Sequence, residues 1–193
     1  MKNIFRILFA SLFVVNFSCH DSENVIDGVL DYEGGAILRT ISIDNSVLNS
    51  SDPNSAFLAT VEEQDDADGA LLSEIRVNAL FRDLSPEDGT TEAYGFVYSI
   101  PASETTVGPV GLPRADIAMT FSAAVSAMGL TSADYNPGDV IVVQLEVVLT
   151  DGRVFGPDSA AGVITGGFFA SPFQYNALLT CSPAPGDYVV EMQ

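Results

Sequence analysis

The segment VEEQDDADG, residues 61–69, holds the densest group of side chains that could do chemistry in this 193-residue sequence. Its acids all precede Gly69 and are Glu62, Glu63, Asp65, Asp66 and Asp68. Carboxylates this close repel one another unless a cation or solvent compensates their charge. Calcium, which takes about six to eight oxygen ligands, is the natural compensating ion. The acids do not spell an EF-hand, because Gln64 and Ile75 would fall on its first and twelfth positions.

Two acids from other parts of the chain could complete such a site. If consecutive strands run antiparallel, the turn at 63–71 lies at the same end of the domain as the 101–114 loop and the Asp151-Gly152 pair. Glu104 and Asp151 are then the nearest additional ligands. The sequence therefore predicts a calcium site in which these two residues join the five acids of the turn. The alternative is a solvated acidic turn, which is what runs of charge usually are.

A second candidate site is the aromatic segment EAYGFVYSI, residues 92–100. Period-two spacing places Tyr94, Phe96 and Tyr98 on one face of a strand. If exposed, the row would form a stacking platform for sugar rings, as in carbohydrate-binding modules. The alternative is that the rings fill the core and the tyrosine hydroxyls reach its rim. The segment GGFFASPFQY is a further aromatic candidate under the same alternative, with Phe168, Phe169, Phe173 and Tyr175.

The composition argues against most kinds of catalysis. The sole histidine is His20, so neither a histidine-based triad nor a multi-histidine metal site can form within one chain. Paired carboxylates can hydrolyse glycosides without histidine, but no spacing singles out such a pair. Cys181 has no histidine base nearby, so we interpret it as a structural residue, either a buried thiol or one that is paired. The sequence predicts no catalytic residues and a protein that is not an enzyme.

The charge balance excludes one class of partner. The chain carries 26 acidic and 7 basic residues, a net charge of −19. Loss of residues 1–18 would also remove Lys2 and Arg6, leaving 5 basic residues and a net charge of −21. The remaining arginines are scattered along the chain rather than clustered. Such a chain repels phosphate backbones, so we do not expect it to bind nucleic acid.

The N-terminus has the three parts of a secretory signal peptide. Lys2 and Arg6 form a basic start, an apolar run follows at 7–15, and the small residue Ser18 stands directly before Cys19. The apolar run is too short to span a bilayer comfortably. The sequence predicts that residues 1–18 are a cleaved leader.

The residues Ser18 and Cys19 resemble the cleavage site of a bacterial lipoprotein precursor, although Asn16 and Phe17 depart from the usual pattern. The resemblance implies that Cys19 is acylated and becomes the first mature residue. More than one acyl chain gives a firm membrane anchor. The alternative is ordinary signal-peptidase cleavage, with Cys19 able to form a disulfide with Cys181 in an oxidising compartment.

The acids directly after Cys19 suggest a more specific location. Asp21 and Glu23 resemble the export signal of Bacteroidetes-type lipoproteins, which places them on the outer face of the outer membrane. The resemblance implies a lipid-anchored outer-membrane protein exposed on the cell surface. The alternative is the periplasmic face.

The body of the chain has strand patterning rather than helical spacing. In SEIRVNALF, Ile75, Val77, Ala79 and Phe81 alternate with polar residues, and in AILRTISI, Ile37, Arg39, Ile41 and Ile43 share one face. Further strands are predicted at 55–62, 92–100, 115–121, 139–150, 153–155 and 173–180. Asp151-Gly152 is a hairpin signal. One short helix is predicted at 122–128, with Gly129 as its left-handed C-terminal cap.

These elements predict an all-β fold, an antiparallel β-sandwich with one short helix. The segment PGDVIVVQLEVVLTDGRVF resembles the late strand and hairpin of immunoglobulin-like or fibronectin-type-III-like modules. We expect an acidic tether at 19–35, the sandwich domain at 36–181, and a Pro-rich linker and strand at 182–193. The last segment would be either an edge strand of the sandwich or the start of a missing domain.

The sequence as a whole predicts a non-catalytic binding or structural module held to the membrane by an N-terminal lipid. Polysaccharide capture for nutrient uptake is one expected role. Adhesion to, or assembly with, another envelope protein is the alternative, and a carboxylate-dependent hydrolase is a third. No cofactor is expected apart from the calcium considered above.

Overall fold

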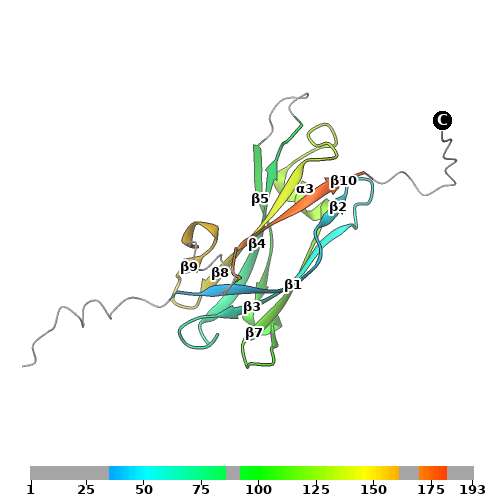
Figure 1. The fold of residues 1–193 in the computed structure, drawn as a ribbon. Coiled ribbons are helices and arrows are strands. Elements are labelled where there is room, and N and C mark those ends of the chain that lie inside the picture. The colour runs from blue at the N-terminus through cyan, green and yellow to red at the C-terminus, as the bar shows by residue number, and fades with distance from the viewer. Residues whose placement is uncertain (1–34, 86–91, 161–169, 182–193) are drawn as a thin grey trace, which may run out of the picture. The chain divides into compact units, whose positions relative to one another are not determined.

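The computed structural model describes residues 35–85, 92–160 and 170–181, which belong to one compact unit that starts at Gly35. Two β-sheets pack face to face in this unit (Figure 1). The first sheet, called sheet A, has the order β1 (Ile37–Asn45), β3 (Ala56–Gln64), β7 (Pro113–Thr120) and β6 (Thr106–Val107). The predicted all-β sandwich is confirmed.

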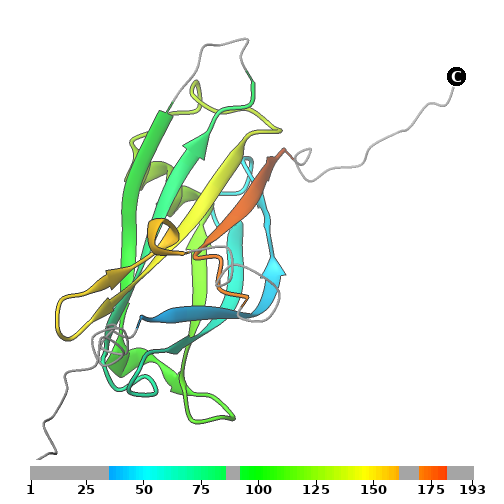
Figure 2. The ribbon, with the colours of Figure 1, turned by 60° about the vertical axis from the view of Figure 1, so that its left-hand side comes forward.

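The second sheet, sheet B, has the order β2 (Val47–Asn49), β10 (Gln174–Thr180), β8 (Val140–Leu149), β4 (Leu72–Arg82) and β5 (Glu92–Pro101). The short strand β9 (Val154–Phe155) pairs with β8. Figure 2 shows β5, β4, β8 and β10 side by side, in green, blue-green, yellow and orange. The neighbours among these four strands are antiparallel, whereas β2 is parallel to β10.

The strand order is that of an immunoglobulin-like sandwich. In that fold, strands A, B, E and D form one sheet, and strands C, F and G form the other, with C′ added beside C in variable-type domains. Strands β1, β3, β7 and β6 match the first set, and β4, β8, β10 and β5 match the second. The chain crosses between the sheets at Ser46, directly after β1, to form β2.

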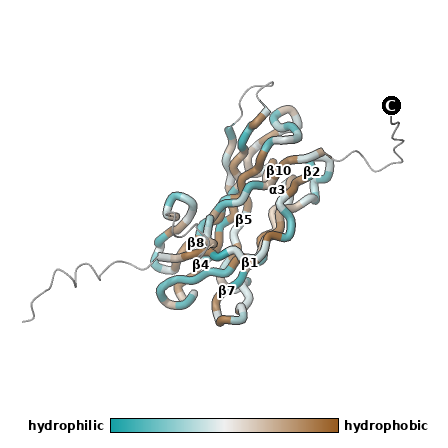
Figure 3. The backbone as a smooth tube through the Cα atoms, viewed as in Figure 1, coloured by the Kyte–Doolittle hydropathy of each residue, from teal (hydrophilic) through white to brown (hydrophobic). Residues whose placement is uncertain are grey.

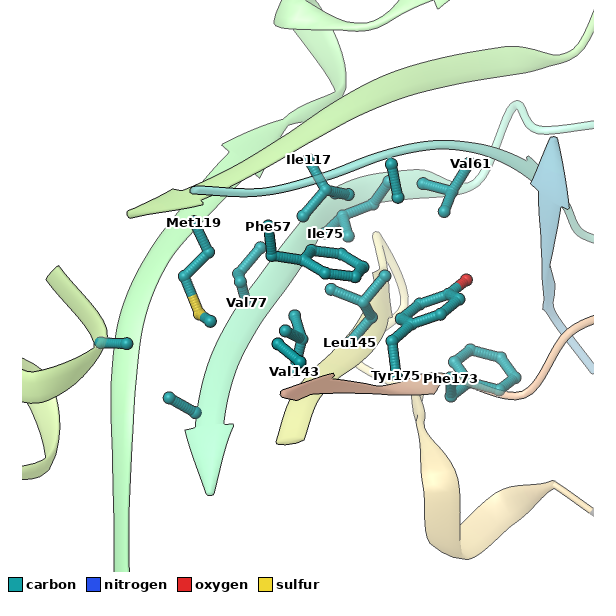
Figure 4. Packing of buried hydrophobic residues seen from close by; sticks show 14 of the residues in the cluster. Phe57, Val61, Ile75, Val77, Ile117, Met119, Val143, Leu145, Phe173 and Tyr175 are labelled. Atoms are coloured by element: carbon teal, nitrogen blue, oxygen red, sulfur yellow. The ribbon is translucent and has the colours of Figure 1, made fainter. Parts of the chain in front are cut away.

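The core lies between the sheets, and Figure 4 shows its side chains at close range. Sheet A contributes Phe57 and Ile117, and sheet B contributes Val77 and Leu145, each no more than 1 % exposed. The ring of Tyr175 lies 5.5 Å from that of Phe57 and closes one side of this cluster. Hydrophobic and hydrophilic stretches follow one another along the strands (Figure 3), as expected for sheets with one buried face.

The strands predicted between residues 36 and 180 all form, with ends shifted by a few residues, but the first one buries a different side chain. In β1 the buried residue is Leu38, whereas Ile41 and Ile43 are 39 % and 49 % exposed. Irregularities after Thr40 and after Ile43 interrupt the alternation of the strand. The face that Ile41 and Ile43 share with Arg39 in the period-two pattern is therefore the outer one, although two of its members are apolar.

The predicted helix forms as α3 (Phe121–Met128), and Gly129 adopts the left-handed conformation at its C-terminus with φ of 68°. The side chain of Thr120 caps the other end by accepting a hydrogen bond from the N–H of Ala123. The helix lies so close to β5 that a Cβ atom on Gly95 would sit 2.2 Å from the carbonyl oxygen of Ala127. A glycine at this position is what lets the helix close this part of the sandwich.

The predicted leader, the tether up to residue 34 and the C-terminal segment 182–193 lie outside the described residues. Within the described ranges, no helix is long and apolar enough to span a bilayer.

Candidate binding site

In the acidic turn, backbone N–H groups donate hydrogen bonds to both carboxylate oxygens of Asp65. One of its oxygens accepts hydrogen bonds from the N–H groups of Ala67 and Gly69 at 2.7 and 2.8 Å. The other accepts from the N–H of Leu71 at 2.8 Å. Asp65 is only 5 % exposed, so its carboxylate shapes the turn instead of facing an ion from solvent.

Glu62 is compensated by arginine rather than by a metal ion. Its side chain is 2 % exposed and lies between Arg39 and Arg114 on the outer face of sheet A. Arg39 donates to one carboxylate oxygen at 3.3 Å, and Arg114 donates from Nε to the other at 2.7 Å. The three residues are cross-strand neighbours on β1, β3 and β7, so strand register brings them together.

A third arginine joins two more of the acids. Arg153 contacts Asp151 at 2.8 Å and Asp66 at 3.9 Å. Its hydrogen bond holds the pKa of Asp151 below the ordinary value. The N–H of Thr150 also donates to the carbonyl of Leu71 at 2.8 Å. The predicted neighbourhood of the turn and the hairpin is therefore confirmed, but a guanidinium group links them.

Glu63 faces inward and is fully buried, and neither of its carboxyl oxygens has a hydrogen-bond partner. Burial, with a smaller contribution from the charge of Asp65, raises the pKa of Glu63 from 4.5 to about 8. The close approach of Gly69, where a Cβ atom would lie 3.3 Å from Oε2, helps to seal the group from solvent. Glu63 is therefore protonated at neutral pH.

The predicted calcium ligands are thus not assembled into a metal site. Within the described ranges, no group of three or more His, Cys, Asp or Glu side chains is placed to hold a metal ion. Arginine side chains and backbone N–H groups contact both carboxylate oxygens of Glu62, Asp65 and Asp151. Glu104 lies in a groove beside Arg114, which is described below. Asp68 is exposed and has φ of 53° in the turn.

The aromatic strand gives a clearer candidate site. Tyr94 and Phe96 are 54 % and 55 % exposed on the outer face of sheet B. Gly95 between them faces the opposite way, against α3. Two of the three predicted platform residues therefore do present their rings to solvent.

Tyr98 does not belong to this row. Tyr98 is the cross-strand partner of Val77 and Phe96 that of Asn78, so Val97 has no opposite residue and forms a bulge. A bulge reverses the faces of the residues that follow it. Tyr98 consequently packs against the core, and its hydroxyl accepts a hydrogen bond from the N–H of Ala118 on sheet A at 3.0 Å. Burial raises the pKa of this hydroxyl.

Amide side chains from other strands share cross-strand rows with the two exposed rings, and one of them, Asn78, is on the neighbouring strand β4. The register places Phe96, Asn78, Gln144 and Gln174 in one row across sheet B, and Tyr94, Leu80, Val142 and Asn176 in the next. Asn78 is 3 % exposed, and its Nδ2 has no hydrogen-bond partner. Sequence patterns could not identify this set, because its members come from four strands whose register no local signal reveals.

The second aromatic candidate is divided by the structure. Phe173 and Tyr175 are core residues, 1 % and 7 % exposed, and are not available for stacking on a ligand. The hydroxyl of Tyr175 pairs with that of Thr40 at 2.8 Å, which fixes the ring at the edge of the core. Phe168 and Phe169 lie outside the described residues.

The structure describes only one of the two cysteines. Cys181 is exposed, so the interpretation of it as a buried thiol is wrong. It forms no disulfide within the described residues, and its pairing with Cys19 or with another partner stays a prediction. Cys19 lies outside the described residues, and its acylation stays a prediction.

The fold and the exposed face define the class of protein as an all-β sandwich with two aromatic rings presented on the outer face of its six-stranded sheet. No protein-family model matches the chain, and no curated protein does either.

Proposed function

We propose that this protein is a lipid-anchored, non-catalytic module of the bacterial outer membrane that binds uncharged glycans at the cell surface. The observation that carries the proposal is the exposure of Tyr94 and Phe96, side by side on one face of β5. Large aromatic rings are usually buried in a sandwich core or an interface. Two neighbouring rings that are each about half exposed therefore indicate a contact surface.

The arrangement suits a sugar chain. Residues two apart on a strand are separated by about 7 Å, so the two rings can stack against neighbouring units of one glycan. The amides of Gln144, Gln174 and Asn176 lie in the same cross-strand rows and can both donate to and accept from sugar hydroxyls. Apolar ring faces with a few polar groups beside them are typical of small-molecule and sugar sites.

The negative charge of the protein restricts which glycans it can bind. A net charge of −19, or −21 after loss of residues 1–18, creates a field that repels anionic polymers such as polyuronates. Uncharged polysaccharides meet no such barrier. The amides in the rows of the two rings are neutral as well, and the row next to Tyr94 carries one charge of each sign, on Arg82 and Glu92.

The proposed anchor is the acylated Cys19, with residues up to 35 as a tether that clears the lipid headgroups. Cys19→Ala in the full chain tests this. The variant should leave the membrane fraction and lose acyl labelling, with Cys181→Ala as the matched control that should remain bound. Unchanged fractionation of the Cys19 variant would defeat the lipoprotein assignment.

A protein partner is the second candidate, and one observation favours it. Val47 on β2 and Leu178 on β10 are cross-strand partners and are 42 % and 45 % exposed. They form a small apolar patch near the edge of sheet B opposite β5. Adhesion through this patch would survive the loss of both exposed aromatic rings.

The test of glycan binding uses the full chain carrying Cys19→Ala, with soluble glucan, xylan, mannan and galactan as probes in affinity electrophoresis. We expect retardation by at least one polymer and its loss in the double variant Tyr94→Ala, Phe96→Ala. The double variant Ile41→Ala, Ile43→Ala, which removes exposed apolar side chains from sheet A, should behave as the parent. Absence of retardation by all four polymers would count against the proposal.

A further inference from the structure

Among the described residues, strand β5 is the last strand of sheet B, and its edge lies on the same side as that of β7 in sheet A. In sheet A, β6 pairs only with Pro113 and Arg114, so within the described residues β7 has no strand partner on that side beyond these two. The hydrogen bond from the N–H of Ala118 to the hydroxyl of Tyr98 links the two edges.

A groove of about 320 Å³ lies between β5 and β7, beside this hydrogen bond. That volume falls at the lower end of the range for small-molecule sites. Tyr98 and Ile100 line it from sheet B. Thr106, Arg114 and Asp116 line it from sheet A, and Glu104 lines it from the connection between the sheets. The sequence analysis named Glu104 and Tyr98 for other roles, and the fold brings both into this groove.

Polar groups in the groove have hydrogen-bonding capacity to spare. Arg114 uses Nε for Glu62, and its two Nη groups have no hydrogen-bond partner among the described residues. The exposed carboxylate of Glu104 forms no ion pair with Arg114. Asp116 accepts from the hydroxyl of Thr60 through one oxygen at 2.8 Å, which leaves the other oxygen available.

Arg114 is held in place for this role. Its bond to Glu62 is 2.7 Å long, and Arg39 holds the other oxygen of the same carboxylate. Gly108 lies directly over the pair, since a Cβ atom there would fall 2.5 Å from Oε2 of Glu62 and 2.7 Å from Nε of Arg114. A guanidinium fixed in this way loses little freedom when it binds a ligand.

The balance of charges selects the ligand. Arg114 disfavours a simple cation, and the two carboxylates together with the net negative charge disfavour an anion. A sugar hydroxyl can donate to Glu104 or Asp116 and accept from Arg114, while Tyr98 and Ile100 meet the C–H faces of the ring. We propose that the groove between β5 and β7 is a second subsite that holds a single uncharged sugar residue; the inference rests on the proposed glycan-binding function and adds a site to it.

The test is an amide NMR titration of the full chain carrying Cys19→Ala, with D-glucose, D-galactose, D-mannose and D-xylose as separate probes. We expect at least one sugar to shift the amide signals of Asp116 and Ala118. Glu104→Ala should weaken that binding about tenfold or more, which corresponds to about 1.4 kcal/mol. Glu92→Ala, an exposed acid at the far end of β5, is the matched control and should leave the affinity unchanged.

The outcomes separate this inference from the proposed function. Groove shifts that persist in Tyr94→Ala, Phe96→Ala support the subsite even if the polymers fail to bind the aromatic face. Polymer binding without any shift at Asp116 or Ala118 overturns the subsite and leaves the aromatic face intact. Equal effects of Glu104→Ala and Glu92→Ala overturn it too. Shifts caused by glycine, added as a zwitterionic probe, but by none of the sugars would assign the groove to a different ligand class.

Discussion

Arg114 on β7 donates a 2.7 Å hydrogen bond to Glu62 on β3, and this pair organises the outer face of sheet A. The carboxylate is 2 % exposed, so its charge depends on nearby guanidinium groups rather than on water. Removal of Arg114 would leave this buried carboxylate with only the longer, 3.3 Å contact to Arg39.

We therefore predict that Arg114→Leu destabilises the protein more than Arg39→Leu. Arg114 is the more buried of the two and bonds at 2.7 Å, against 3.3 Å for Arg39. The expected loss for Arg114→Leu is about 3 kcal/mol in the free energy of unfolding. Chemical denaturation of both variants measures the difference. Equal losses would mean that Glu62 does not depend on the shorter bond.

Glu63 should make stability fall as pH rises. In the folded state its pKa is about 8, against an ordinary value of 4.5, so folding takes up a proton between these values. The unfolded chain binds fewer protons in that window, and stability therefore decreases from about pH 4.5 to about pH 8. The pKa difference corresponds to a loss of up to about 5 kcal/mol.

Glu63→Gln removes this titration but keeps the shape of the side chain. The difference in unfolding free energy between parent and variant, measured by urea denaturation at about pH 5 and about pH 8, should grow in favour of the variant. The exposed acid Glu104, changed to Gln, supplies the control and should show no such trend. A parent and Glu63 variant with parallel pH profiles would show that the carboxyl is not buried in neutral form.

Gly95→Ala should loosen the contact between β5 and α3. A Cβ atom at this position meets the carbonyl of Ala127 at 2.2 Å, and backbone cannot give way as a flexible side chain can. The expected cost is about 2 kcal/mol, as for other overpacking changes. Gly35→Ala is the matched control, because its Cβ would find its nearest neighbour, the ring of Phe155, at 3.7 Å. Similar melting temperatures for the two variants would contradict the tight packing of the helix.

Much of this fold follows from local patterns. The alternation in 73–81, the branched run in 139–150 and the glycine after Met128 each predict an element that forms. Strand β2 was not predicted, because a strand of three residues is too short to show an alternation of apolar and polar side chains. The bulge at Val97 was not foreseen either, since its cause is the pairing of β5 with β4 and not the sequence of β5 alone.

The candidate sites, like the strands, could be predicted only in part from local sequence patterns. The exposure of Tyr94 and Phe96 fits the surface platform considered from the sequence, whereas the bulge at Val97 removes Tyr98 from the row. The acidic turn misled the ligand assignment, because the arginines that neutralise Glu62 and Asp66 are distant in sequence. Long-range register, which a single sequence does not reveal, decides which charges meet.

The central claim is that the rings of Tyr94 and Phe96 contact glycan, and saturation-transfer NMR tests it most directly. Aromatic protons of the full chain carrying Cys19→Ala are saturated in the presence of an oligosaccharide from a polymer that the protein retards. We predict transfer to the C–H protons of the sugar and its loss in Tyr94→Ala, Phe96→Ala. Transfer of equal strength from that double variant would contradict the account.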